Sequence, residues 1–363
     1  MTVIDLSVVG LGLVSPTALS PRQHVFFIAA ESTLGTARAF VDGAGQRLGA
    51  IHCPWLDPGL PLGARVTELG RRALGTALEP AIASPELARC RLPAMLCCAA
   101  PSVAFAAEDA AGCEQAWAQR YPLDFGARLH GEAGLFHGLA TAAHWLSSGA
   151  VPAVVLVAVD SHCSVAALGA RPLGARRWER VPAYLSEAAA ALVVVSPGRE
   201  GGLPSLGRIS FASVRPASAS DDNDEIVDGT SMTQLLAQAA GEGLKITQAF
   251  GQHNVDRLRH LSWTFSVSRN CRAFDPLCRF VCVEDAIGRV GAAAGAAHLV
   301  YGLATELHGT ASYGGGGTLA AWAVSRDGTC GLAIARGANG GQGAKGGPGV
   351  EEHTGAKGVA GAP

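Results

Sequence analysis

Residues 287–309 read IGRVGAAAGAAHLVYGLATELHG, and this stretch decides the fold of the chain. Its first half is almost entirely glycine and alanine, whereas its second half carries larger apolar residues. Glycine lets a loop adopt conformations that are closed to other residues, and it lets neighbouring backbone come close. The stretch therefore predicts a glycine-rich loop that runs directly into a helix. Two charged residues mark this loop, Glu284 just before it and Arg289 inside it.

The beginning of the chain predicts a strand. Residues 8–16 (VVGLGLVSP) are β-branched and apolar up to a turn. A Gly-x-Gly after a strand also begins the dinucleotide-binding fingerprint. Here Ser15 stands in the place of the third glycine and Pro16 follows it, with no pattern that opens a helix. The sequence therefore disfavours a Rossmann site.

The remainder of the first half alternates between strands and a helix. Residues 92–100 and 151–160 are near-continuous apolar runs, as expected of strands that are buried on both faces. Between them, residues 134–148 carry leucine and alanine at helical spacing, and Gly149 ends the helix. A further apolar run at 185–196 is closed by Pro-Gly and predicts another strand. This alternation favours parallel α/β layers.

The rest of the chain repeats this style, and we expect two similar halves, residues 1–198 and 199–336. The second half is predicted to hold strands at 206–213, 258–265 and 280–283, a helix at about 230–240, and a closing hairpin of 319–324 and 330–335. Residues 337–363 are rich in glycine and alanine and show no apolar period. Such a composition cannot offset the entropy of ordering, which predicts a disordered tail.

Composition and charge exclude several classes of protein. A chain of 363 residues with 48% hydrophobic and 16% charged residues can bury a large core. Its net charge of -2 gives no electrostatic footprint for nucleic acid or for an anionic membrane surface. The N-terminus lacks the basic region of a signal peptide, and no stretch approaches the ~20 apolar residues of a membrane span. We therefore expect a soluble cytoplasmic protein.

Neither the cysteines nor the histidines form a metal-binding pattern in the sequence. The cysteines nearest to zinc-ribbon spacing do not match it: Cys271, Cys278 and Cys282. Three histidines recur every seven residues, which separates them by about 10 Å on a helix and is too wide for one ion: His130, His137 and His144. We therefore predict no metal and no cofactor, and expect mostly buried, reduced thiols.

Taken in order, these segments resemble the thiolase-like superfamily and, within it, the β-ketoacyl synthases of fatty acid and polyketide synthesis. The family opens with a strand and a Val-Ser-Pro turn, which residues 8–16 match, and has a strand end after the nucleophile helix, which residues 155–161 match. Its segment with a structural glutamate matches residues 184–194. Its glycine and alanine loop matches residues 287–295, and its closing hairpin matches residues 317–336. Their order covers nearly all of residues 3–336. The resemblance implies an α/β protein with a thiolase-like, five-layered α/β/α/β/α fold built from two similar halves.

The same resemblance implies that the catalytic residues have been replaced. The family's nucleophile is a cysteine in a turn that feeds a helix, where backbone N–H groups and the helix dipole stabilise a thiolate and an oxyanion. That position falls on Glu132, and no cysteine lies between Cys113 and Cys163. The other catalytic positions also carry different residue types: the first histidine, in a His-Gly-Thr turn after a strand, falls near Thr264, the second histidine on Arg289, and the lysine on Glu284.

These replacements favour a condensation-deficient pseudoenzyme similar to the chain length factors, which are ketosynthase paralogues that serve as partner subunits, or an acyl-chain binding protein. The implied partners are an acyl carrier protein and, in a dimer, either a second copy or an active ketosynthase. An alternative stays open: an active divergent acyltransferase, either a 3-oxoacyl synthase or a malonyl decarboxylase, in which Arg289 binds the thioester oxygen and Glu132 or Cys163 reacts. A structural subunit without a ligand is a third interpretation. Glu187 is expected to be the family's structural glutamate, and Glu284 to pair with Arg289.

Overall fold

The computed structural model describes residues 5–32, 36–41, 47–102, 104–164, 184–198, 208–214, 229–241, 243–253, 255, 257–308, 317–325 and 327–336. The predicted tail, 337–363, lies outside this part of the chain. Among the helices in these ranges, none is both long enough and apolar enough to cross a membrane.

The first half of the chain builds a sheet with helices on both faces. Its elements in chain order are β1 (Asp5–Val14), α1 (Pro21–Ala29), β2 (Thr36–Val41), β3 (Arg47–His52), α2 (Leu62–Ala83), η1 (Leu87–Arg89), β4 (Leu92–Cys98), α3 (Ala107–Arg120), β5 (Leu123–His130), α4 (Gly134–Ser147), β6 (Val154–Ser161) and β7 (Glu187–Val195).

The second half of the chain runs through a similar order of elements. They are β8 (Arg208–Val214), α6 (Thr230–Gly241), β9 (Ile246–Gly251), α7 (Arg257–Arg269), η2 (Cys271–Ala273), β10 (Phe274–Val281), α8 (Glu284–Ile287), η3 (Gly291–Ala293), α9 (Ala294–His308), β11 (Thr318–Val324) and β12 (Cys330–Arg336).

All strands except β2 and β3 join in one sheet of ten strands, in the order β10-β9-β11-β12-β8-β1-β7-β6-β4-β5. In the first half, β5, β4 and β6 run parallel, and β7 and β1 pair antiparallel. In the second half, β10, β9 and β11 run parallel, and β12 and β8 pair antiparallel. The halves meet where β1 and β8 pair through Asp5–Ser7. Strands β5 and β10 lie at the two ends of the sheet. Strands β2 and β3 form a separate hairpin.

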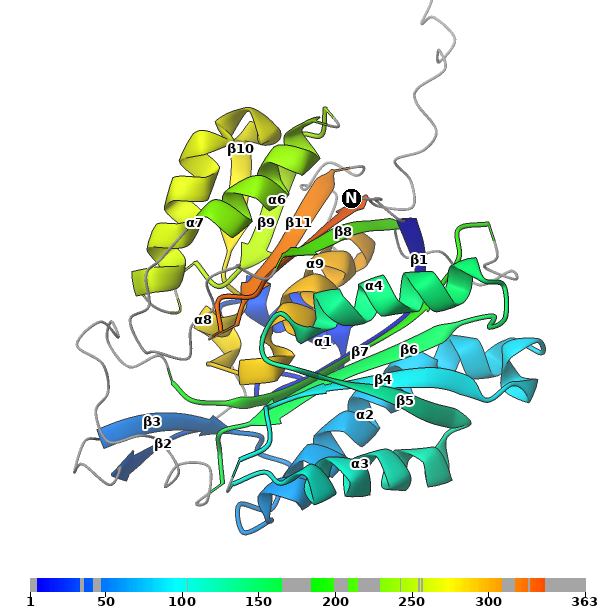
Figure 1. Cartoon of the computed structure of the whole chain (residues 1–363). Coiled ribbons are helices and arrows are strands. Elements are labelled where there is room, and N and C mark those ends of the chain that lie inside the picture. Colours follow the sequence, from blue (N-terminus) through cyan, green and yellow to red (C-terminus); the bar gives the residue numbers. More distant parts are fainter. Residues whose placement is uncertain are drawn as a thin grey trace, which may run out of the picture.

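The helices and the two halves of the sheet form five layers (Figure 1). Helices α4 and α9 lie in the centre, because each of them contacts strands of both halves. Helices α2 and α3 cover the outer face of the first half, and α6 and α7 cover the outer face of the second. Three hydrophobic cores fill the spaces between these layers, and the largest surrounds α4 and α9. The α/β/α/β/α architecture predicted from the sequence is confirmed.

Two glycines in β1 explain the Gly-x-Gly of the opening strand. A Cβ at Gly10 would lie 2.0 Å from the carbonyl oxygen of Ala77, and one at Gly12 would lie 2.0 Å from that of Ala73. Both carbonyls belong to α2, so the glycines let the helix backbone pack directly on the strand. They lie within β1, which continues to Val14. The motif is a packing device in the middle of a strand.

The prediction of a strand at 258–265 was wrong, because this segment lies in helix α7. Its buried residues follow a helical period, but most are polar: Arg259, Ser262, Trp263 and Ser266. Since the buried face of α7 is not apolar, hydrophobic spacing did not reveal the helix. The second-half strands are instead β9 and β10, on either side of α7.

Candidate active site

Glu132 lies in the turn between β5 and α4, as the sequence predicted. Gly131 turns the chain with φ 78°, and its N–H donates to the carbonyl of Cys98 at 3.2 Å. The N–H of Ala133 donates to Ser325 Oγ at 2.9 Å. A Cβ at Gly131 would lie 2.7 Å from that same Oγ. Ser325, which follows β11, therefore fixes the tight turn that presents Glu132 at the start of α4.

The carboxylate of Glu132 is paired with Arg259 of α7. Arg259 Nη2 donates to Glu132 Oε1 at 2.9 Å, and the two side chains are only 10% and 13% exposed. Arg259 Nε also donates to the carbonyl oxygen of Val324 at 3.0 Å. A guanidinium held at two points is a fixed, permanently charged partner. The charge of Glu132 is therefore neutralised by a side chain from the other half of the protein.

Gln252 connects this ion pair to a second carboxylate. Its Oε1 accepts the N–H of Val324 at 3.0 Å, and its Nε2 donates to Glu284 Oε2 at 3.2 Å. Val324 is thus bonded to Arg259 through its carbonyl and to Gln252 through its N–H. The result is a continuous polar chain from Glu132 to Glu284 in a region that excludes most water.

Glu284 is buried and ionised. Its Oε1 accepts the N–H of Val290 at 3.2 Å, and its Oε2 lies 3.6 Å from Nε2 of the fully buried His298. Burial alone would raise the pKa of the carboxyl, but His298, the charge of Arg289 and the Val290 N–H outweigh it and lower the pKa. The expected attraction between Glu284 and Arg289 is therefore present, and His298 is a further partner of the carboxylate.

The backbone of Arg289 is fixed by the segment before β7. Its N–H donates to the carbonyl of Tyr184 at 2.7 Å, and its carbonyl accepts the N–H of Ser186 at 2.8 Å. Gly288 has φ 81°, and a Cβ there would lie 2.6 Å from the Cβ of Ser186. The position of Arg289 is therefore set by close backbone packing that only glycine at 288 permits.

The glycine and alanine loop brings these groups together. The N–H of Ala292 donates to Asp160 Oδ2 at 2.9 Å, at the end of β6. A Cβ at Gly295 would lie 2.5 Å from the carbonyl oxygen of Glu132. The loop that decided the fold in the sequence thus packs against the turn that carries Glu132. Of the four predicted site residues, Glu132, Glu284 and Arg289 lie around this loop.

Thr264 does not lie where the resemblance placed it. It is exposed, in the second half of α7, and not in a turn after a strand. The strand that precedes α7 is β9, and the turn at its end reads Phe250-Gly251-Gln252. Gly251 is the last residue of this strand, and the buried Phe250 stands before it. The sequence analysis missed Gln252, because β9 ahead of it contains Thr247 and Gln248 and gives no clear strand signal.

His253 follows Gln252 and faces the same region. Burial, and next the proximity of His298, lower the pKa of His253 to about 4. Its ring lies edge-on to Phe280, with centroids 6.4 Å apart. A neutral imidazole here can donate one hydrogen bond and accept another, but it carries no positive charge near neutral pH.

Cys163, the other residue considered as a nucleophile, is a buried thiol. It is 2% exposed, and its Sγ donates to the carbonyl of Ile51 at 3.4 Å. Burial and the negative charge of Glu187 raise its pKa far above the ordinary range. The nucleophile in thiol chemistry is the thiolate, so Cys163 is inert in this environment.

Glu187 lies beside Cys163 and has partners on both carboxylate oxygens. Its carboxylate accepts the N–H of Cys53 and the hydroxyl of Ser161, both at 2.8 Å, and pairs with Arg65 Nε at 3.3 Å. Glu187 and Arg65 are both completely buried. These contacts tie β7 to α2, β6 and the residue after β3, which is the arrangement expected of a structural glutamate.

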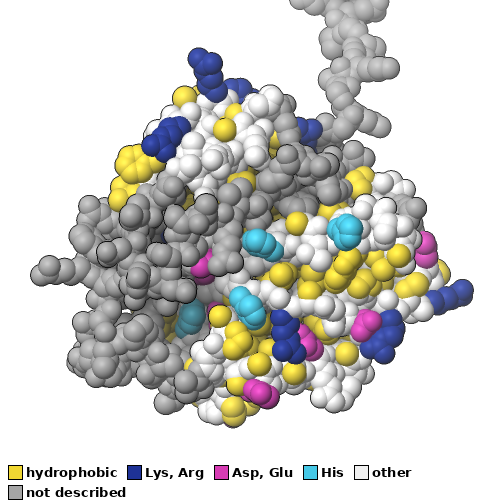
Figure 2. Space-filling view, in the orientation of Figure 1, with side chains coloured by type: hydrophobic (Ala, Val, Ile, Leu, Met, Phe, Trp, Pro, Cys, Tyr) yellow, Lys and Arg dark blue, Asp and Glu magenta, His cyan; other side chains and the backbone are white. Residues whose placement is uncertain are grey.

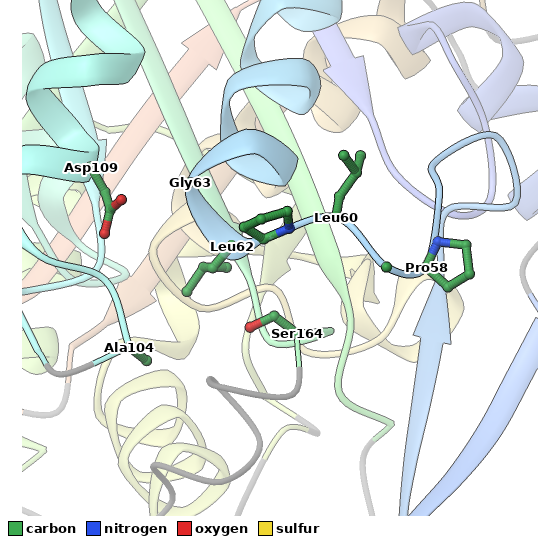
Figure 3. Close-up of a pocket in the computed structure, with 9 residues that line it drawn as sticks. Pro58, Leu60, Leu62, Gly63, Ala104, Asp109 and Ser164 are labelled. Atoms are coloured by element: carbon green, nitrogen blue, oxygen red, sulfur yellow. The ribbon is translucent and has the colours of Figure 1, made fainter.

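A pocket of about 330 Å³ opens near the start of α2 (Figure 3). Its lining is mostly apolar: Pro58, Gly59, Leu60, Pro61, Leu62, Gly63, Ala104, Asp109 and Ser164. Asp109 Oδ2 already accepts the N–H of Ala106 at 2.9 Å. None of the four predicted site residues lines this pocket, so it is separate from the candidate active site.

Comparisons with known proteins identify the fold. No protein-family model and no curated protein matches the sequence. Among solved structures, the ishigamide ketosynthase/chain length factor aligns with a TM-score of 0.68 at 17% identity, over 92% of this chain and 99% of its own. The ketosynthase from module 6 of the bacillaene synthase from Bacillus subtilis 168 gives 0.66 at 13%, over 92% and 72%.

A third structure, AntDE:AntF, described as a type II polyketide synthase acyl-carrier protein in complex with its ketosynthase bound to the hexaketide, gives a TM-score of 0.64 at 12% identity. It covers 93% of this chain and all of the matched one. At such low identities the likeness concerns the fold. The protein has the thiolase-like fold of ketosynthases and chain length factors.

Proposed function

We propose that this protein is a β-ketoacyl synthase homologue of polyketide or fatty acid type biosynthesis that does not itself catalyse condensation. It acts as a partner subunit of an active synthase or as an acyl-chain binding protein. The observation that carries the proposal is the ion pair of Glu132 and Arg259 in the turn before α4, 2.9 Å apart and largely buried.

The ion pair removes the chemistry that acyl transfer needs at this turn. A nucleophile at a helix start works because its anion is free to attack and the nearby N–H groups then stabilise the oxyanion. The carboxylate of Glu132 is instead engaged by a guanidinium, and its attack on a thioester would give an anhydride, which is less stable than the thioester. Cys97 and Cys98 of β4 lie beside this turn, but both are buried and burial raises the pKa of both thiols, so neither supplies a thiolate in its place.

The charges around the loop also oppose condensation. Decarboxylation of a malonyl thioester develops negative charge on the thioester oxygen, and a synthase stabilises it with neutral or positive donors. Here the buried Glu284 is held ionised, and Gln252 already uses one amide hydrogen on it. A second carboxylate in this region would repel the developing charge. We therefore infer that both half-reactions of a synthase are disfavoured.

The end of the sheet offers a surface for a partner. Strand β5 pairs only with β4 among the described strands, so its other side is open to a strand of another chain. Its residues alternate between exposed and partly buried. On the face shown in Figure 2, hydrophobic side chains gather over the region of α4 and β5. We propose that this surface joins a second copy or an active ketosynthase, and that the complex receives chains from an acyl carrier protein.

The test compares the chain alone with the chain mixed with an active ketosynthase. The purified protein is incubated with malonyl and acyl thioesters of an acyl carrier protein. We expect neither release of carbon dioxide nor a mass increase of the chain, whereas the mixture with a suitable ketosynthase yields product whose chain length depends on this protein. Turnover by the chain alone would overturn the proposal. An acyl adduct on Glu132 would favour the alternative, an active divergent acyltransferase.

A further inference from the structure

A buried cluster of potential metal ligands lies apart from the candidate active site. It consists of His52 at the end of β3, Cys163 after β6 and Glu187 at the start of β7. One ligand atom of each, a ring nitrogen, the Sγ and a carboxylate oxygen, lies within 4.8 Å of the other two, and all three residues are buried. These residues are far apart in sequence, so spacing along the chain gave no sign of the cluster.

We propose that this cluster binds one Zn²⁺ ion, with His52, Cys163 and Glu187 as ligands and the thiol of Cys53 as the fourth. Nitrogen, thiolate sulfur and carboxylate oxygen are the donors that zinc takes in proteins. Bond lengths of about 2.0–2.3 Å in a tetrahedron place ligand atoms about 3.3–3.8 Å apart. The three ligand atoms therefore need to move together by about 1 Å or less.

Cys53 lies next to these three residues but outside the set of ligand atoms within 4.8 Å of one another, so its thiol has to turn toward the ion to complete the site. Its thiol hydrogen-bonds to Glu187 and lies close enough to Cys163 for the two to interact electrostatically. Its backbone N–H holds Glu187 Oε1 at 2.8 Å. Cys53 is 1% exposed and Cys163 is 2% exposed, so both thiols are shielded from competing water. A closed set of four protein ligands is typical of a structural zinc site.

Arg65 balances the charge of the site both with and without metal. Without metal, Glu187 pairs with Arg65 at 3.3 Å. When Zn²⁺ binds, the two thiols lose their protons, so two thiolates and one carboxylate face one divalent ion and one guanidinium. The sum of charges is zero in both states. Once the Cys53 thiol has lost its proton, Glu187 has a lone pair for the metal, since the contacts with the Cys53 N–H, Ser161 and Arg65 use three of about four sites.

The ion would fasten the hairpin of β2 and β3 to the body of the protein. Strand β3 is joined to the segment before β7 by backbone hydrogen bonds between Ile51 and Leu185 and between Leu185 and Gly49, each 2.8 Å. The neighbouring residues of that segment, Tyr184 and Ser186, hold the backbone of Arg289. Zinc would therefore stabilise the rim beside the glycine and alanine loop. This inference is independent of whether the protein condenses acyl chains.

Elemental analysis and cobalt substitution test the site in the full chain. Protein purified without chelator is expected to contain one zinc per chain. After removal of zinc under reducing conditions, Co²⁺ alone is added, and thiolate-to-cobalt charge-transfer absorption is expected to saturate at one equivalent. Cys163→Ser and His52→Ala should weaken Co²⁺ binding at least tenfold, and the exposed Cys271→Ser is the matched control that should leave it unchanged.

The cobalt titration of the unaltered protein decides the matter even if a variant fails to fold. Absence of both stoichiometric zinc and thiolate-to-cobalt absorption would overturn the proposal. Absorption that persists undiminished in folded Cys163→Ser and His52→Ala would also overturn it, because the metal would then lie elsewhere. Circular dichroism of each variant establishes whether it is folded.

Discussion

Replacing Arg259 and Glu132 singly and together is expected to reveal a coupling energy that a surface ion pair lacks. We choose Arg259→Met, which keeps an apolar stem, and Glu132→Gln, which keeps the shape of the carboxylate. At 2.9 Å and an effective dielectric constant of about 20, the attraction is about 6 kcal/mol. Desolvation and side-chain ordering offset most of it, so we expect a net coupling of about 2 kcal/mol.

Urea unfolding of the four proteins, followed by circular dichroism at pH 7, gives the coupling energy as a double-mutant cycle. The cycle removes the loss of the Arg259 to Val324 hydrogen bond, because that loss occurs with and without Glu132. The partly exposed pair of Arg128 and Glu114, 2.7 Å apart, serves as a control and is expected to give about 0.2–1 kcal/mol.

A coupling for Glu132 and Arg259 within about 0.5 kcal/mol of zero, or no larger than that of the control pair, would refute the reasoning. Glu132 would then be a carboxylate that Arg259 does not restrain, and the enzymatic alternative would gain support. A coupling of the expected size means that the Glu132 carboxylate stabilises the folded protein through its ion pair with Arg259.

Three further outcomes are expected. Glu132→Cys should create a thiol that iodoacetamide labels faster than Cys163, since Arg259 and the start of α4 favour a thiolate there. Condensation should stay absent. Labelling rates are followed by peptide mass spectrometry, and equal rates at the two cysteines would contradict this prediction. Burial lowers the pKa of His24 from 6.5 to about 4, so its contribution to stability is complete above pH 6.5 and is lost as the pH falls toward 4. His24→Gln should therefore flatten the fall in unfolding free energy over that window by about 3 kcal/mol, and an unchanged slope would show that His24 is protonated in the folded state. Gly12→Ala should destabilise the protein by about 1–3 kcal/mol or more in thermal and urea unfolding, because the new methyl meets the carbonyl of Ala73. The control is Gly112→Ala on α3, where the methyl has open space, and it should stabilise the protein by about 0.5–1 kcal/mol. Equal effects of the two substitutions would argue against the close packing of α2 on β1.

The sequence predicted the architecture because the buried strands and the glycine loop carry strong local signals. Strands β4, β6 and β7 are apolar except for Asp160 and Ser161 at the end of β6 and Glu187 at the start of β7, as expected of strands covered on both faces. The loop at 287–295 has glycine at 291, beside Asp160, and at 295, beside Glu132, because a side chain at either position would clash with these residues. Edge strand β5 was not predicted, because its exposed face carries polar residues and a glycine.

The candidate site was less predictable, because its contacts join distant parts of the chain. Glu132 could be placed by counting along α4, but Arg259 lies 127 residues away on a helix that was predicted as a strand. Gln252 has no motif of its own, and its role follows only from the position of Val324 beside it. The cluster at Glu187 likewise brings together residues separated by more than one hundred positions. Such pairings are fixed by the folded topology.

The central layer has a consequence for how the protein folds and unfolds. Helix α4 comes from the first half but packs on β8 and β12, and α9 comes from the second half but packs on β1 and β7. Each half therefore lends a helix to the core of the other, and neither could close its own hydrophobic core if expressed alone. We expect slow amide hydrogen exchange in β6 and β11 to be lost together, in a single cooperative opening. A protein built in this way can exchange side chains around the turn before α4 while the two halves remain inseparable.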